Sequence, residues 1–127
     1  MPVQFLSDEW ASELKRRLNE NESFRRGIAN TNATIQQLIT TPEGERRYWL
    51  KTENGQVDMG QGDAPNADAT IAQDYDTAVA LARSELNAVT AFMTGKIRIS
   101  GNLGLLMGLQ GALAELPRVM QEMDVDY

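Results

Sequence analysis

Residues 96–111 read KIRISGNLGLLMGLQG, and this stretch decides how the rest of the chain is interpreted. Its first five residues alternate between charged or polar and apolar side chains, which is typical of a β-strand with Ile97 and Ile99 on its buried face. A turn at Gly101 and Asn102 follows, and leucines then recur at helical spacing. The segment therefore predicts a strand, a glycine turn and an apolar helix.

Spacing, charge and length exclude most of the sites that glycine-rich segments form. A dinucleotide fingerprint and a P-loop both need motifs that are absent here. Gly101 to Gly104 fits the GxxG loop of a KH domain, but the loop has no positive charge and the next helix has none before Arg118. No apolar run reaches the ~18 residues that span a bilayer. Gly104 and Gly108 form a GxxxG pair, which in such a chain predicts close helix packing.

The helix that begins near Asn102 has apolar side chains on nearly every face. A helix of this kind must be buried on all sides. A plain hydrophobic core is the simpler interpretation. However, a chain of 127 residues has little interior, unless a cavity, a ligand or a partner supplies one side. The glycines, which cost ~1 kcal/mol each relative to alanine, favour a space kept open or a close backbone approach.

Composition narrows the classes of function. We expect a single domain, residues 1–127, and the net charge of −6 argues against binding to nucleic acid. Residues 1–52 carry a net charge of +1 and residues 53–127 carry −7, so contact with anionic lipid is expected on the N-terminal half. The chain has no cysteine and no histidine, which excludes thiolate and imidazole catalysis and most zinc sites.

Acidic residues give no sign of a metal centre. Five aspartates in the middle of the chain match no EF-hand spacing and are typical of turns: Asp58, Asp63, Asp68, Asp74 and Asp76. We therefore expect no metal, no cofactor and no catalytic residue. The N-terminus MPVQFLSDEW lacks the pattern of a signal peptide, and the C-terminus DVDY lacks a peroxisomal address, so a cytoplasmic protein is expected.

The other segments predict an α+β fold. Ser7 is a candidate helix cap, and an apolar stripe follows it at Trp10, Leu14 and Leu18. A second short helix is expected over residues 22–28. Four strands are predicted as an antiparallel meander, over residues 33–41, 46–52, 56–62 and 68–73.

Side-chain alternation along the strands and helix-breaking residues complete the prediction of the elements. Tyr48 and Leu50 share one face of their strand, and Trp49 takes the other. Helical segments follow from Asp74 or Asp76 to Leu86, over residues 87–95, and from Asn102 to a break near Pro117.

An ordered set of identities resembles the C-terminal half of the sterol carrier protein 2 (SCP2) domain family. The detailed match covers about residues 69–110 and includes a helix ending in Phe-x-x-Gly-Lys, a basic and apolar strand, and Gly-Asn-x-Gly-Leu-x-Met-x-Leu-Gln. The matching residues are Phe92, Gly95, Lys96, Gly101, Asn102, Gly104, Leu105, Met107, Leu109 and Gln110.

The resemblance implies a five-stranded, mostly antiparallel sheet with helices on one face and an apolar tunnel between them. It also implies a non-enzymatic protein that binds or transfers a fatty acid, a fatty acyl-CoA or a sterol-like lipid. Transient membrane contact and a homodimer are both compatible with it. The segment after Gln110 is longer than in the family, and its apolar stripe could close the tunnel or dock a partner: Leu113, Leu116 and Met120.

We expect nine residues to bind the lipid. Gln110 is the candidate polar contact for a headgroup, although a hydrogen bond between helices would explain it equally well. The full set is Val79, Leu86, Phe92, Met93, Ile99, Leu103, Leu106, Met107 and Gln110. The alternative is an accessory protein with a vestigial cavity, either a dimer formed through the Trp49 face or a partner of a lipid-processing enzyme.

Overall fold

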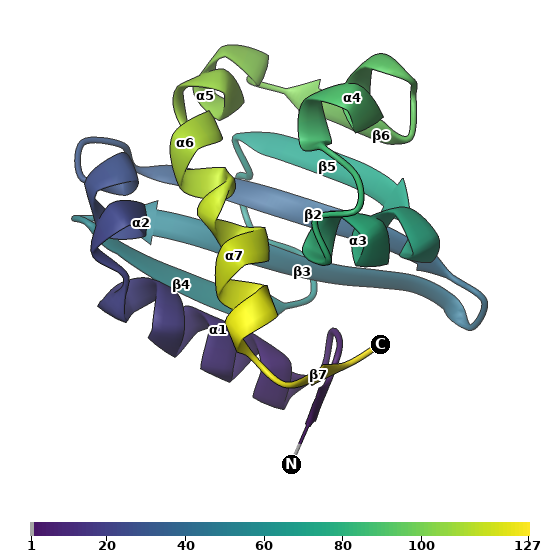
Figure 1. The fold of residues 1–127 in the computed structure, drawn as a ribbon. Helices are drawn as coiled ribbons and strands as arrows, with labels where there is room; N and C mark the ends of the chain where they lie inside the picture. The colour runs from purple at the N-terminus through teal and green to yellow at the C-terminus, as the bar shows by residue number, and fades with distance from the viewer. Residues whose placement is uncertain (1) are drawn as a thin grey trace.

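A computed structural model describes residues 2–127. The elements are, in chain order, β1 (Val3–Gln4), α1 (Asp8–Glu20), α2 (Glu22–Ile28), β2 (Ala33–Thr41), β3 (Gly44–Glu53), β4 (Gln56–Gln61), β5 (Ala69–Asp74), α3 (Tyr75–Ala82), α4 (Ala88–Met93), β6 (Ile97–Gly101), α5 (Leu103–Gly108), α6 (Gln110–Leu113), α7 (Glu115–Glu122) and β7 (Val125–Asp126). Four strands, β2 to β5, follow one another without an intervening helix, and the helices lie on one face of the main sheet, as in an α+β fold (Figure 1).

The main sheet has five strands in the order β4-β3-β2-β5-β6. Every neighbouring pair is antiparallel except β2 and β5, which run parallel with Ile35 opposite Ala69. The mostly antiparallel sheet is therefore confirmed. The simple four-stranded meander is wrong, because β5 does not pair with β4 but crosses to the far side of β2.

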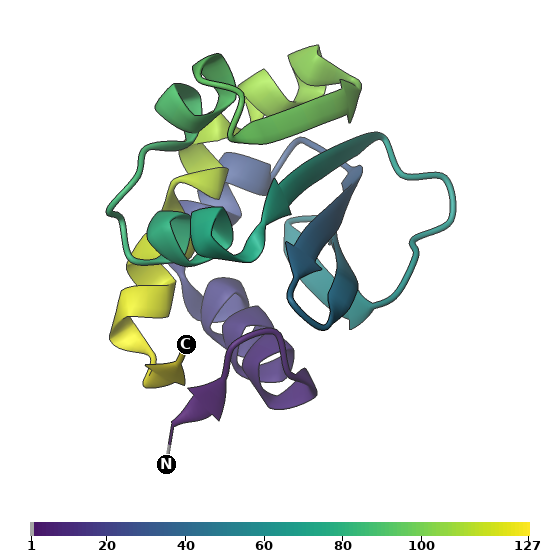
Figure 2. The same cartoon turned by 90° about the vertical axis from the view of Figure 1, so that its right-hand side faces the viewer.

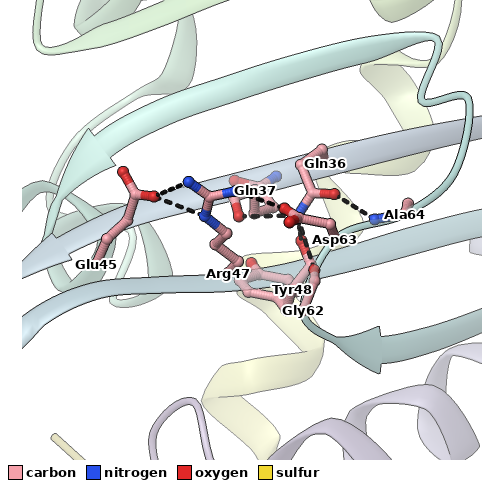
Figure 3. A network of polar contacts seen from close by, with 8 residues as sticks. All are labelled: Gln36, Gln37, Glu45, Arg47, Tyr48, Gly62, Asp63 and Ala64. Atoms are coloured by element: carbon pink, nitrogen blue, oxygen red, sulfur yellow. Dashed lines mark hydrogen bonds and ion pairs between the residues drawn. The ribbon is translucent and has the colours of Figure 1, made fainter.

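The crossing loop, residues 62–68, lies against the face of the sheet that the helices leave uncovered (Figure 2). Gln36 on β2 holds it there with a side chain that is only 6% exposed. The Gln36 amide nitrogen donates to the carbonyl oxygens of Gly62 (3.0 Å) and Tyr48 (3.1 Å), and the Gln36 amide oxygen accepts from Ala64 N–H at 2.6 Å (Figure 3). Buried polar groups need such partners, so Gln36 fixes the path that makes β5 parallel to β2.

Arg47 holds the start of the same loop from the neighbouring strand. Its guanidinium pairs with Asp63 at 2.7 Å and with Glu45 at 2.6 Å, and its carbonyl oxygen accepts from Gly62 N–H at 2.9 Å (Figure 3). These charged side chains are exposed, so each pair contributes little to stability. The buried amide of Gln36 is the stronger determinant of the loop's position.

The core fills the space between the helices and the inner face of the sheet. Trp10, Leu14 and Leu18 form the predicted stripe on α1 and are at most 1% exposed. Ser7 caps this helix by accepting from Trp10 N–H at 3.2 Å, as its position predicted. Trp49 lies on the opposite face of the sheet, where its indole ring covers Gly60.

The C-terminal segment differs from the prediction in two respects. The helix is interrupted near Pro117, at Ala114 between α6 and α7, but it does not end there, because Pro117 lies in the first turn of α7, where backbone N–H groups have no partner within the helix. The acidic segment after this helix contains β7, which was not predicted and which pairs in parallel with β1. Two-residue strands carry no periodicity, so neither could be read from the sequence.

Candidate functional site

A small cavity lies between strands β2–β4 and helices α1, α6 and α7. Its volume is about 20 Å³, which is room for one water molecule and not for an acyl chain. The walls are apolar apart from one amide and one phenol, and the lining residues are Leu14, Ile35, Gln37, Tyr48, Leu50, Met59, Leu113, Leu116 and Met120. This cavity is therefore not an open tunnel.

Two polar side chains face this apolar space. The Gln37 amide oxygen accepts a hydrogen bond from the Gln73 amide at 2.9 Å. The Tyr48 ring makes an edge contact with Trp10, with centroids 5.4 Å apart. Burial raises the pKa of the Tyr48 hydroxyl, so it remains a neutral donor at physiological pH. Tyr48 and Gln37 are therefore suited to hydrogen-bond a polar group that enters with an apolar ligand.

A row of inward-facing side chains runs from this cavity across the sheet. Gln37 is opposite Tyr48 on β3 and Ile71 on β5, and Ile71 is opposite Ile99 on β6. This row, Tyr48–Gln37–Ile71–Ile99, spans three strand spacings, about 14 Å. All four side chains of the row are half-buried.

The turn between β6 and α5 explains why Gly101 is followed by Asn102 in the sequence. Gly101 has φ +94°, and a Cβ there would lie 2.6 Å from the Asp68 carbonyl oxygen, so no other residue fits without strain. Asn102 donates from its N–H to the same oxygen at 2.9 Å and caps α5 by accepting from Leu105 N–H at 3.0 Å. The two residues together aim α5 back across the edge of the sheet.

The GxxxG pair does not pack helices together. No atom lies within 4 Å of a Cβ placed at Gly108, and at Gly104 the only neighbour is the Asn102 side chain at 3.5 Å. The close helix contact is made elsewhere, where a Cβ at Gly27 would lie 2.8 Å from the Ala112 Cβ. The prediction of close packing at Gly104 and Gly108 is therefore wrong, since α5 lies at the surface.

The nine predicted lipid-binding residues lie outside the cavity. Ile99 belongs to the inward-facing row, Leu106 is buried in the core, and Val79 and Leu86 are half-buried. Gln110 is exposed.

The other four predicted residues are exposed by 40% or more: Phe92 at 40%, Met93 at 79%, Leu103 at 41% and Met107 at 66%. The expectation that every side of the helix after Asn102 is buried is therefore wrong. The helix is short and lies over the edge strand β6, so its outer side chains meet no second layer.

Most of the cavity wall was not among the predicted residues. Gln37 and Met59 carry no signal of their own, because the register between strands brings them to the cavity. The helical wall did have a signal, the stripe of Leu113, Leu116 and Met120, all three of which line it.

Residues 2–127 contain neither a membrane-spanning helix nor a cluster of metal-binding side chains. None of the described helices is both long and apolar enough to cross a bilayer. The same residues contain no group of three or more acidic side chains that could hold a metal ion.

Comparison with known proteins identifies the fold and the family. The profile of the SCP-2 sterol transfer family matches residues 11–114. Sterol carrier protein 2 of Gallus gallus is 32% identical over 100 residues, which are 77% of this chain and 18% of that protein. The chain thus spans less than a fifth of the length of this relative.

Solved structures show the same arrangement of elements. A crystal structure of sterol carrier protein 2 has a TM-score of 0.79 at 23% identity and covers 94% of this chain and 98% of that one. A solution structure of palmitated SCP2L2 from Aedes aegypti has a TM-score of 0.63 at 21% identity and covers 89% of this chain and 92% of that one. The chain belongs to the SCP-2 sterol transfer family.

Proposed function

We propose that residues 1–127 act as one non-enzymatic, cytoplasmic domain that binds a lipid between the sheet and the helices and transfers it between membranes. The observation that carries this proposal is the apolar cavity, with Gln37 and Tyr48 as its polar groups, in a chain of the SCP-2 sterol transfer family. The relative from Aedes aegypti is described as palmitated, which makes a fatty acid or its acyl-CoA our first choice of ligand and a sterol-like molecule the second.

The cavity must widen to accept such a ligand, and its walls suit that change. Met59 and Met120 are flexible side chains that adapt to irregular shapes. Movement of α6 and α7 away from the sheet would extend the cavity along the inward-facing row toward Ile99. Burying about 12 methylenes would contribute about 10 kcal/mol, from which the cost of association and of the displaced helix contacts is subtracted.

The nine residues predicted from the sequence fit the outer end of this path. Val79, Leu86, Ile99 and Leu106 would contact the apolar body of the ligand, and the exposed Gln110 would meet the end of the ligand opposite to the one that Gln37 and Tyr48 bind. The four exposed members would surround the mouth where the ligand enters: Phe92, Met93, Leu103 and Met107.

An accessory role in a larger lipid-processing enzyme is the second candidate. It is favoured by the closed cavity and by the length of the relatives, of which this chain matches only a part. Dimerisation through Trp49 has less support, because the indole ring lies against Gly60 and is half-buried within its own sheet.

The proposal is tested by lipid extraction and by titration. Organic solvent extracts of the purified protein are analysed for bound lipid by mass spectrometry, and a fluorescent fatty acid is titrated into the wild type and into Leu116→Trp, which fills the cavity from α7. The matched control is Leu38→Trp, the same change on the opposite face of the sheet. We expect saturable binding that Leu116→Trp weakens at least tenfold and that Leu38→Trp leaves within about twofold. If extracts contain no lipid and no saturable binding occurs, lipid transfer is wrong and the accessory role gains.

A further inference from the structure

Exposed apolar side chains are concentrated at one end of the molecule. All of the exposed large hydrophobic residues among residues 2–127 lie on α4 and α5: Val89, Phe92, Met93, Leu103 and Met107. These two helices lie on either side of β6 at the same end of the molecule in both views (Figures 1 and 2). Apolar groups that gather in this way mark an interaction surface more often than singly scattered ones do.

The same end is the positively charged part of an acidic protein. The chain has a net charge of −6, yet no Asp or Glu occurs between Glu85 and Glu115. Lys96, which directly precedes β6, and Arg98, which belongs to β6, are the charged residues in that interval, and both are exposed. An anionic surface would therefore be attracted to this end and repelled by much of the remainder.

Among residues 2–127, Lys96 and Arg98 also differ from the other basic residues in forming no ion pair, hydrogen bond or aromatic contact through their charged groups. Of the 12 Lys and Arg side chains, seven form ion pairs with Asp or Glu within the described part of the chain. Arg25 and Arg46 donate to backbone carbonyl oxygens, and Arg83 lies over the Tyr127 ring. Lys96 and Arg98 make no such contact with residues 2–127, so their charges are available to an external partner.

The charge of Lys96 affects the pKa of the Asp74 carboxyl group. Its pKa is lowered mainly by the hydrogen bond from Thr77 N–H, and Lys96 adds a smaller electrostatic contribution. The Asp74 carboxylate caps α3 by accepting from Thr77 N–H at 2.8 Å, and it forms no ion pair with Lys96.

We propose that the α4–α5 surface, consisting of Val89, Phe92, Met93, Lys96, Arg98, Leu103 and Met107, docks on an anionic lipid bilayer. The five apolar side chains insert among the headgroups, and the two cations contact lipid phosphates or carboxylates. This inference rests on the proposed lipid transfer, for which it names the membrane-facing surface: Ile99, the last residue of the inward-facing row, lies on the strand between the two helices. Net charge alone predicted such a contact on the N-terminal half. The Lys and Arg side chains there already form ion pairs or hydrogen bonds within the protein.

The test compares two double variants that remove the same charge. Binding to phosphatidylcholine vesicles, with and without phosphatidylserine, is measured by flotation at physiological ionic strength. We expect Lys96→Gln with Arg98→Gln to reduce partitioning onto phosphatidylserine vesicles at least tenfold, since each cation near such a surface contributes about fivefold. The control, Arg26→Gln with Lys51→Gln, removes exposed cations from the N-terminal half and should change partitioning less than about twofold. An equal loss in both variants, or no vesicle binding by the wild type, would overturn the inference.

The apolar part is tested with Met93→Ser and Met107→Ser together. Both side chains are largely exposed, so circular dichroism should show an unchanged fold while partitioning falls at least tenfold on both kinds of vesicle. If the wild type is instead a dimer in sedimentation experiments and this variant is a monomer, a second copy of the chain occupies the surface and the inference is wrong.

Fatty-acid titration in solution separates this inference from the proposed function. Saturable fatty-acid binding without vesicle binding would sink the docking inference and leave lipid binding intact. Vesicle binding without fatty-acid binding would contradict lipid binding and leave the docking inference intact.

Discussion

The two ends of the sheet use the same alternation of side chains but differ in what covers them. At the β2–β4 end, α1, α6 and α7 bury the inner face so completely that only about 20 Å³ stays open. At the β6 end, α4 and α5 leave Met93 and Met107 more than 60% exposed. The β2–β4 end is therefore the well-packed part of the molecule, and the β6 end carries the exposed apolar side chains.

Truncation of one large side chain at each end should give the largest contrast. Leu14→Ala, at a residue that is 1% exposed and lines the cavity, is expected to lower the free energy of unfolding by about 2–5 kcal/mol. Met107→Ala should change it by less than about 0.5 kcal/mol. Urea denaturation followed by circular dichroism measures both. Similar losses in the two variants would mean that the α4–α5 surface is covered in solution.

Two glycines sharpen the comparison at the β6 end. Gly101→Ala is expected to cost about 1–3 kcal/mol, because φ is +94° and the new Cβ would lie 2.6 Å from a carbonyl oxygen. Gly108→Ala, in open space at the end of α5, should be neutral or stabilise by up to about 1 kcal/mol. Thermal unfolding of the two variants beside the wild type decides the matter, and a destabilised Gly108→Ala would show that α5 needs its glycine for another reason.

The smallest expected effect on stability concerns a charged residue at the well-packed β2–β4 end. The pKa of Asp58 on β4 is lowered, mainly by its hydrogen bond with Lys15 of α1 at 2.8 Å. A lowered folded-state pKa means that the carboxylate stabilises the fold above its unfolded pKa, about 3.9, and that this stabilisation is lost as the pH falls through the folded value. Asp58→Asn should therefore cost up to about 1 kcal/mol at pH 7 and nothing in strong acid.

Denaturation of Asp58→Asn and wild type across the acidic range tests this sign. The gap between the two proteins should shrink in high salt, because the pair is exposed and is screened. A gap that widened toward low pH would show that the carboxylate is destabilising.

Much of the fold followed from the sequence because its signals are local. The β2 strand, the Ser7 cap, the α1 stripe and the Gly101–Asn102 turn each depend on residues close together in the chain. The parallel pairing of β5 with β2 did not follow, because it depends on Gln36 binding a loop that lies 26 or more residues further along. Alternation shows which face of a strand is buried but not which strand lies beside it.

The site could be predicted only in part for the same reason. The apolar stripe of Leu113 and Leu116 was visible at helical spacing, whereas Gln37 reaches the cavity through a register that no single segment encodes. The apolar residues of α5 were identified from the sequence, but they were expected to be buried, and Leu103 and Met107 are exposed. Hydrophobicity does not reveal whether a second layer of protein exists to cover it.

The contact between Trp10 and Tyr48 gives the protein its own optical reporter. Trp10 is fully buried, and its indole nitrogen has no hydrogen-bond partner among residues 2–127, so its fluorescence should be shifted to the blue. Trp49 is on the opposite face of the sheet and half-buried, so its emission should lie further to the red. A molecule that enters beside Tyr48 should alter the blue emission and leave the red emission unchanged, so that occupancy of the cavity can be followed without any label.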